Sequence, residues 1–184
     1  MSDKKTKILV VFYSLYGNTA KLAKAVAEGA MQVRDVEARL RQVEELIPRE
    51  KIESDEILKR VKKELSDIPI ATKDDLVWAD GIAFGSPTRY GNMTAQMKQF
   101  IDQTGQLWAE GKLINKVAGV FTSTSTMHGG QETTITSTML PLLHHGMILV
   151  GIPYSEQRLF SLSAGGGSPY GASSVSGPNA DHPP

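Results

Sequence analysis

A repeated succession of an apolar run, a polar loop and a helical pattern constrains the fold of this chain most strongly. Residues 7–13 read K-I-L-V-V-F-Y, a continuous apolar run that is typical of a strand buried on both faces of a sheet. A polar turn follows at residues 14–19, and residues 20–31 then place alanine, leucine and valine at helical spacing. This stretch therefore predicts a strand, a tight turn and a helix in that order.

The same pattern returns further along the chain. Residues 81–85 (G-I-A-F-G) and 116–121 (K-V-A-G-V-F) predict two more strands, each of which runs into a polar loop and a helix. Residues 147–152 predict a fifth strand. Residues 36–43 alternate apolar and polar side chains yet contain good helix formers, and we interpret them as a strand. Five strands separated by helices predict a doubly wound α/β domain, with a parallel sheet and helices on both faces.

Three segments depart from the repeated pattern. Residues 54–65 predict an amphipathic helix, whose many charges we interpret as a solvated face. Residues 131–145 are predicted to be helical, although Pro141 should kink or end that helix early. From Leu159 onward the chain is mostly glycine, serine and proline, with no periodicity after Ser163, which predicts a long surface loop or a disordered tail. The length of 184 residues suits one core, so we expect one domain.

Composition excludes several classes of function. The chain has 20 lysine and arginine residues and 20 aspartate and glutamate residues, so its net charge is zero and no field favours nucleic acid or an anionic membrane. It has no cysteine, which excludes disulfides, thiolate metal sites and cysteine nucleophiles. No signal-peptide core precedes the first strand, and no apolar run is long enough to span a bilayer. We therefore expect a cytoplasmic protein that binds neither membrane nor nucleic acid.

Polar loops follow three of the predicted strands, at residues 14–19, 86–92 and 122–130. In a doubly wound sheet, ligands bind beyond the carboxyl ends of the strands, where the strand order reverses. The first loop combines hydroxyl groups with a glycine and enters a helix N-terminus, which favours a phosphate. It lacks the lysine of a nucleotide-triphosphate loop, and G-x-G-x-x-G is absent as well. The alternative is that Thr19 or Asn18 only caps the helix.

The other two loops offer different chemistry. In the second loop, Arg89 and Tyr90 stand where a plain turn needs neither, and a planar ligand could stack there. The third loop is dense in serine and threonine and ends in two glycines, so its donors suit the carbonyl edge of a heteroaromatic ring. Taken alone, a loop rich in serine and threonine is more often a plain connection than a binding site. The coincidence of all three loops at one edge of the sheet favours a binding site.

Five segments of the chain resemble a known family. They are S-L-Y-G-N-T, G-S-P-T-R-Y-G-N-M, F-I-D-Q-T-G-Q-L-W, G-G-Q-E-T-T-I-T-S-T and H-H-G-M, which look like the signature segments of the WrbA family. The likeness runs from about Ile8 to Gly171, with the segments in the right order. Members are flavodoxin-like, FMN-dependent NAD(P)H:quinone oxidoreductases that assemble as tetramers.

The resemblance implies an architecture. It implies a flavodoxin-like FMN-binding domain over residues 1–158, with a five-stranded parallel sheet in the order 2-1-3-4-5. Residues 159–184 would continue the same domain. In the family a final helix follows this glycine-rich stretch, so we expect the intact protein to extend beyond Pro184.

The resemblance also implies contacts with the cofactor and the substrates. The FMN phosphate would be held by Ser14, Leu15, Tyr16, Gly17, Asn18 and Thr19. The isoalloxazine would be flanked by Thr88, Arg89, Tyr90, Gly91 and Asn92, and its polar edge would be lined by Ser123, Thr124, Ser125, Thr126, Met127, His128 and Gly129. FMN would also be touched by His144, and the nicotinamide or quinone would be faced by Tyr16 and Trp108. The family often has glycines where Met127 and His128 stand.

Simpler roles remain open for some of these residues. Trp108 taken alone fits a packing or interface residue. His144 and His145 fit helix-capping or surface positions better than metal ligands, because consecutive helical residues point in different directions. We expect no metal site.

The implied chemistry belongs to the flavin. NADH or NADPH would reduce FMN, and a quinone would then collect two electrons, so no side chain need act as nucleophile or general base. An electron carrier of the flavodoxin type and an FMN-binding regulatory protein are the alternatives. Such carriers are usually acidic, and the zero net charge together with the aromatic pair Tyr16 and Trp108 favours the enzyme. A signalling receiver domain is rejected, because Ser14 and Ser86 stand where it needs aspartates.

Overall fold

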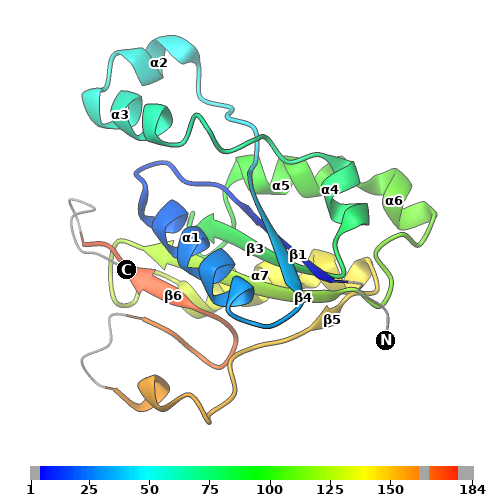
Figure 1. Cartoon of the computed structure of the whole chain (residues 1–184). Coiled ribbons are helices and arrows are strands. Elements are labelled where there is room, and N and C mark those ends of the chain that lie inside the picture. The colour runs from blue at the N-terminus through cyan, green and yellow to red at the C-terminus, as the bar shows by residue number, and fades with distance from the viewer. Residues whose placement is uncertain (1–4, 162–165, 178–184) are drawn as a thin grey trace.

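The protein is a parallel sheet covered by helices on both faces (Figure 1), and the computed structural model describes residues 5–161 and 166–177. The strands are β1 (Thr6–Phe12), β2 (Val36–Gln42), β3 (Gly81–Pro87), β4 (Val117–Thr124), β5 (Ile148–Leu149) and β6 (Ser173–Val175). The helices are α1 (Asn18–Met31), α2 (Arg49–Glu53), α3 (Glu56–Glu64), α4 (Lys73–Trp78), α5 (Ala95–Asp102), α6 (Gly105–Ala109) and α7 (Gln131–His144), with a short 3-10 helix η1 (Gln157–Phe160). The strand order is β2-β1-β3-β4-β5, and β6 pairs with β4. The predicted fold class and strand order are confirmed.

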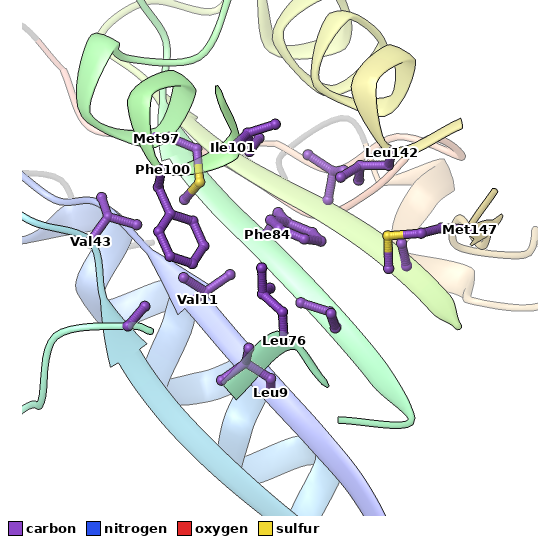
Figure 2. Packing of buried hydrophobic residues seen from close by; sticks show 14 of the residues in the cluster. Leu9, Val11, Val43, Leu76, Phe84, Met97, Phe100, Ile101, Leu142 and Met147 are labelled. Atoms are coloured by element: carbon purple, nitrogen blue, oxygen red, sulfur yellow. The ribbon is translucent and has the colours of Figure 1, made fainter. Parts of the chain in front are cut away.

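Strand β1 supplies side chains to both cores of the molecule. Leu9 and Val11 point to the face covered by α4, α5 and α7, whereas Val10 and Phe12 point to the face covered by α1 and α3. All four are fully buried, as expected of a central strand that is apolar throughout. Figure 2 shows Leu9 and Val11 in the first core, close to Phe84 of β3.

Glycine at position 85 of β3 is required by the second core. A Cβ there would lie 2.1 Å from the ring of Phe121, which is itself 2% exposed. Small residues also line the facing helix, where Ala20 and Ala23 of α1 let that helix approach the sheet closely. The aromatic ring thus fills the space that the small residues leave.

The fifth position of the sheet is divided between two short strands. Strand β5 pairs with the first residues of β4, at Val117 and Ala118, and β6 pairs with its last residues, from Thr122 to Thr124. The predicted fifth strand over residues 147–152 is therefore shorter than expected. The prediction that the chain from Leu159 onward has no regular structure is wrong at β6, because the free edge of β4 offers backbone groups that pair with it. Residues 162–165 and 178–184 lie outside the described residues.

Two helical predictions need correction, and the short helices α2 and α4 were not predicted. Helix α7 continues through Pro141 to His144 rather than ending early, because proline removes only one hydrogen bond and the helix end is held elsewhere. There Gly146 has a φ of 72° and its N–H donates to Leu143, while Met147 N–H donates to Leu142. The segment over residues 54–65 ends one residue early and begins two residues late, as α3. Helix α4 was not predicted, although the structure caps it with a Thr72–Asp75 capping box.

Candidate functional site

The three polar loops meet at the carboxyl-end edge of the sheet around a cavity of about 580 Å³. They are joined there by residues from the segment that contains α3 and by one residue after β6. The cavity is lined by Ser14, Leu15, Tyr16, Asn18, Thr19, Asp55, Ile57, Arg60, Pro87, Thr88, Arg89, Ser123, Thr124, Ser125 and Ser176. Its volume suits a ligand of cofactor size.

The first loop is shaped to receive an anion at the start of α1. The N–H of Gly17 donates to Ser14 Oγ at 3.1 Å, and Gly17 has a φ of 92°, a left-handed conformation that favours glycine. Among the described residues no side chain caps this helix, and its first turn holds no acidic residue. The positive end of the α1 dipole therefore faces the cavity without a competing negative charge in the first turn of the helix.

Buried hydroxyl groups join the first loop to β4 and β3. Thr19 Oγ1 and Ser123 Oγ share a hydrogen bond of 2.7 Å, and both side chains are at least 95% buried. Thr122 Oγ1 donates to the carbonyl of Ser86 at 2.7 Å. Residues 122–124, which were predicted to begin the third loop, are the end of β4 instead. Pairing with β3 and β6 extends the strand into the predicted loop, so these hydroxyls are held rigidly.

The second loop is a tight turn with two residues at positive φ. Arg89 and Asn92 exchange backbone hydrogen bonds of 2.7 and 3.0 Å, with Tyr90 (φ 54°) and Gly91 (φ 77°) between them. Positive φ is unfavourable for tyrosine, and the Tyr90 side chain is fully exposed. Thr88 Oγ1 anchors the turn by accepting from Gly91 N–H at 3.2 Å. A strained turn that presents an exposed aromatic ring beside a cavity fits ligand contact.

Several predicted site residues lie beside the cavity rather than in its wall. They are Gly17 in the first loop, Tyr90, Gly91 and Asn92 in the second, and Thr126 and Gly129 in the third. The third loop turns away after Ser125, because Thr124 Oγ1 donates to the carbonyl of Thr126 at 2.9 Å. Met127 and His128 therefore line a second cavity of about 420 Å³, which also contains Arg158.

Two further predicted residues lie at the opposite edge of the sheet. Helix α7 starts at the carboxyl-end edge and its 14 residues span about 20 Å, so His144 lies at the amino-end edge. Trp108 is 60% exposed on α6, which Figure 1 places near the start of β1, away from the loop before α1. Within one chain, neither side chain lines the cavity.

Of the adjacent histidines His144 and His145, His145 is the buried one. Thr104 Oγ1 donates to the carbonyl of Ile101 at 2.6 Å, so His145 Nε2 is the donor in its 2.8 Å hydrogen bond to Thr104 Oγ1. Its Nδ1 is buried without a hydrogen-bond partner among the described residues. Burial lowers the pKa of His145, and the neighbouring His144 lowers it further.

Sequence reasoning missed the contribution of α3 to the cavity. Asp55, Ile57 and Arg60 line its wall, and Val61 lies beneath the first loop, 3.8 Å from where a Cβ of Gly17 would be. The amphipathic pattern predicted the helix, but its charged face was interpreted only as solvated. Pro87 and Ser176 were also missed, and no sequence signal marks Ser176.

A cluster of hydrogen-bonded polar side chains supports the first loop. Glu45 accepts hydrogen bonds from Tyr13 Oη at 3.0 Å and Gln96 Nε2 at 2.9 Å, and it pairs with Lys62 at 2.5 Å. Lys62 also donates to the carbonyl of Ser14 at 3.2 Å. Burial raises the pKa of the Tyr13 phenol, and Glu45 raises it further. Burial alone would raise the pKa of Glu45, but hydrogen bonds, that from Lys62 first, lower it. The Glu45 carboxylate therefore stays ionised beside a neutral Tyr13 phenol, and Lys62 links this cluster to the first loop.

The described residues contain neither a cluster of metal-binding side chains nor a membrane-spanning helix. Over residues 5–161 and 166–177 there is no group of three or more histidine, cysteine, aspartate or glutamate residues that could hold a metal ion. No helix in those ranges is long and apolar enough to cross a membrane.

The protein-family model and the relatives that match this chain are all named as reductases or dehydrogenases that use NADPH or NAD(P)H. A protein-family model described as NADPH-dependent FMN reductase matches residues 6–155. A protein of Trichlorobacter lovleyi named NAD(P)H dehydrogenase (quinone) is 52% identical over 180 residues, which are 97% of this chain and 88% of the relative. A protein of the same name from Aromatoleum aromaticum is 49% identical over 97% of this chain and 86% of its own length.

Solved structures share the fold. The flavodoxin, WrbA-like protein from Agrobacterium tumefaciens superposes with a TM-score of 0.58 at 28% identity, over 78% of this chain and 76% of that one. Flavodoxin 2 from Bacillus cereus gives a TM-score of 0.59 at 20% identity, over 94% and 86% of the two chains. The second likeness shows the fold alone.

Proposed function

The chain belongs to the NADPH-dependent FMN reductase family, and we propose that it is an FMN-dependent NAD(P)H:quinone oxidoreductase of the WrbA type. The observation that carries the proposal is the convergence of the three polar loops on one cavity of about 580 Å³. The relatives named NAD(P)H dehydrogenase (quinone) support the substrate classes. NADH or NADPH is the reductant, and a quinone is the acceptor.

The residues of the cavity fit the parts of FMN. The start of α1, with the hydroxyls of Ser14 and Thr19, suits the phosphate, because it offers donors and a positive dipole end. The turn that carries Arg89 suits one side of a planar ring system. Ser123 and Ser125 offer hydroxyl groups to a polar ring edge. Bound FMN supplies the two-electron chemistry, and these residues bind it, orient it and surround it with fixed dipoles.

Tyr16 is placed to receive the second substrate. It lines the cavity, yet its side chain is 49% exposed, so one part of the ring contacts the site and the rest meets solvent. An aromatic surface at the mouth of a flavin site suits a nicotinamide or quinone ring. Because both are small and planar, they would occupy this position in turn.

A homotetramer in the cytoplasm completes the proposal. Trp108 and His144 belong to the motifs of the family but lie at the opposite edge of the sheet, so they would meet the flavin only in a neighbouring subunit. The same edge exposes apolar side chains, Ile114 at 57% and Leu143 at 54%, as expected of an interface.

The assembly is tested by sedimentation velocity. We expect the wild type to sediment as a tetramer and Leu143→Asp as a smaller species, because the new charge would be buried at the interface. Val33→Asp is the control, since Val33 is 61% exposed and follows α1, which covers the opposite face of the sheet from α7. A monomeric wild type would contradict the tetramer.

The activity is tested on the purified protein by its visible spectrum. We expect bound or added FMN to give a flavin spectrum, NADH or NADPH to bleach it without oxygen, and benzoquinone to restore it. Failure of the purified protein to bind FMN would refute the proposal. Flavin that NADH and NADPH both fail to bleach would identify an electron carrier instead.

A further inference from the structure

We propose that Arg60 of α3 binds the phosphate of FMN and makes the protein prefer FMN to riboflavin, an inference that rests on the proposed function. The first loop reads S-L-Y-G-N-T and contains no cation, although the phosphate group carries about two negative charges. Arg60 lines the same cavity as Ser14 and Thr19. A segment outside the sequence motifs thus brings a positive charge to the anion site.

The register of α3 directs Arg60 to this position. Three consecutive residues of the helix meet the first loop or the cavity that it borders. Val61 is buried under Gly17, and Lys62 Nζ donates to the carbonyl of Ser14 at 3.2 Å. Arg60 precedes them and lines the cavity wall. Because Val61 and Lys62 fix the helix against the loop, Arg60 is held beside it too.

The other charged side chains near Arg60 form stronger interactions within the chain than Arg60 does. Lys62 pairs with Glu45 at 2.5 Å, and Asp55, also in the cavity wall, accepts from two backbone N–H groups at 2.9 and 3.1 Å as the cap of α3. Arg60 pairs with Glu64 at 3.8 Å, where the two side chains are 70% and 63% exposed. Such an exposed pair is weak, so the guanidinium can turn to a phosphate, whose oxygens match its donors.

Titration of the apoprotein with FMN and riboflavin tests the proposal. We expect Arg60→Gln to raise the Kd for FMN by about ten-fold and to leave the Kd for riboflavin within about two-fold, since only FMN carries the phosphate. The FMN effect should shrink at high salt, because Arg60 is exposed. Lys63→Gln is the matched control, with the same loss of charge on the exposed side of α3, and it should change neither Kd.

Each other outcome has a distinct meaning. An unchanged Kd for FMN in Arg60→Gln would overturn the proposal, as would an equal loss for riboflavin, which would mean a general structural role. A raised KM for NADPH with an unchanged Kd for FMN would also overturn it. A wild-type chain that binds neither flavin would instead refute the proposed function.

Discussion

The two edges of the sheet are built from different side chains. At the carboxyl-end edge, hydroxyl groups such as those of Thr19 and Ser123 are buried and bonded across strands, around an open cavity. At the amino-end edge, α6 and the end of α7 expose Trp108 and Leu143. The loops that line the cavity all lie at the other edge. One edge is therefore organised within a single chain, whereas the other presents a surface that another molecule could cover.

The difference between the two edges shows which of them is held rigidly within one chain. Hydrogen bonds between buried groups are costly to leave unmade, so the carboxyl-end edge holds its loops in one arrangement before a ligand arrives. At the amino-end edge the contact between Thr104 and His145 is the comparable polar element, and it ties α6 to α7. Substitutions should therefore have larger effects at the first edge.

The largest effect is expected from a glycine replacement in the core near the carboxyl end of β3, compared with one in α6 at the amino-end edge. Gly85→Ala should lower the free energy of unfolding by about 3 kcal/mol or more, because the new Cβ would overlap the buried Phe121 ring. Gly105→Ala in α6 is the control, since its Cβ would meet no described atom within 4 Å. It should be neutral or stabilise by up to about 1 kcal/mol. Urea unfolding measures both, and equal stability of the two variants would contradict the prediction.

A smaller effect is expected from a buried hydroxyl. Thr19→Val keeps the shape but leaves Ser123 Oγ without its partner, so stability should fall by about 1–3 kcal/mol. The same replacement at Thr136, whose exposed hydroxyl bonds only within α7, should change stability by less than about 0.5 kcal/mol. Urea unfolding curves with parallel slopes would measure this. If Thr19→Val proves as stable as the wild type, the cross-strand bond does not hold the edge.

The smallest effect is expected at the amino-end edge and depends on pH. Because the pKa of His145 is lowered in the folded state, the unfolded chain binds more protons below about pH 6.5, and stability should fall as the pH drops from 7 toward 5.5. His145→Gln should flatten this slope, whereas His144→Gln should keep most of it. Thermal unfolding at several pH values measures the slope. An unchanged slope in His145→Gln would mean that another group titrates in this window.

Much of the fold follows from local sequence patterns. Apolar runs such as residues 7–13 are typical of strands that are buried on both faces in a parallel sheet, and that sheet places the following loops at one edge. The chemistry of the first loop was equally readable, because Gly17 and a helix start are adjacent in sequence. The resemblance to a family predicted FMN as the ligand. It also predicted that Trp108 and His144 contact the flavin site, although within one chain they lie at the other edge of the sheet.

Only the tertiary structure decided which distant segments complete the edge. The periodicity of residues 54–65 predicts a helix, but it cannot say that Val61 packs under Gly17 and brings Arg60 to the cavity. Likewise, the serines of β6 carry no strand pattern, and they pair because β4 leaves its edge free there. Periodicity reports which face of an element is apolar. The partner of that face is chosen by packing between segments far apart in the chain, which no local pattern records.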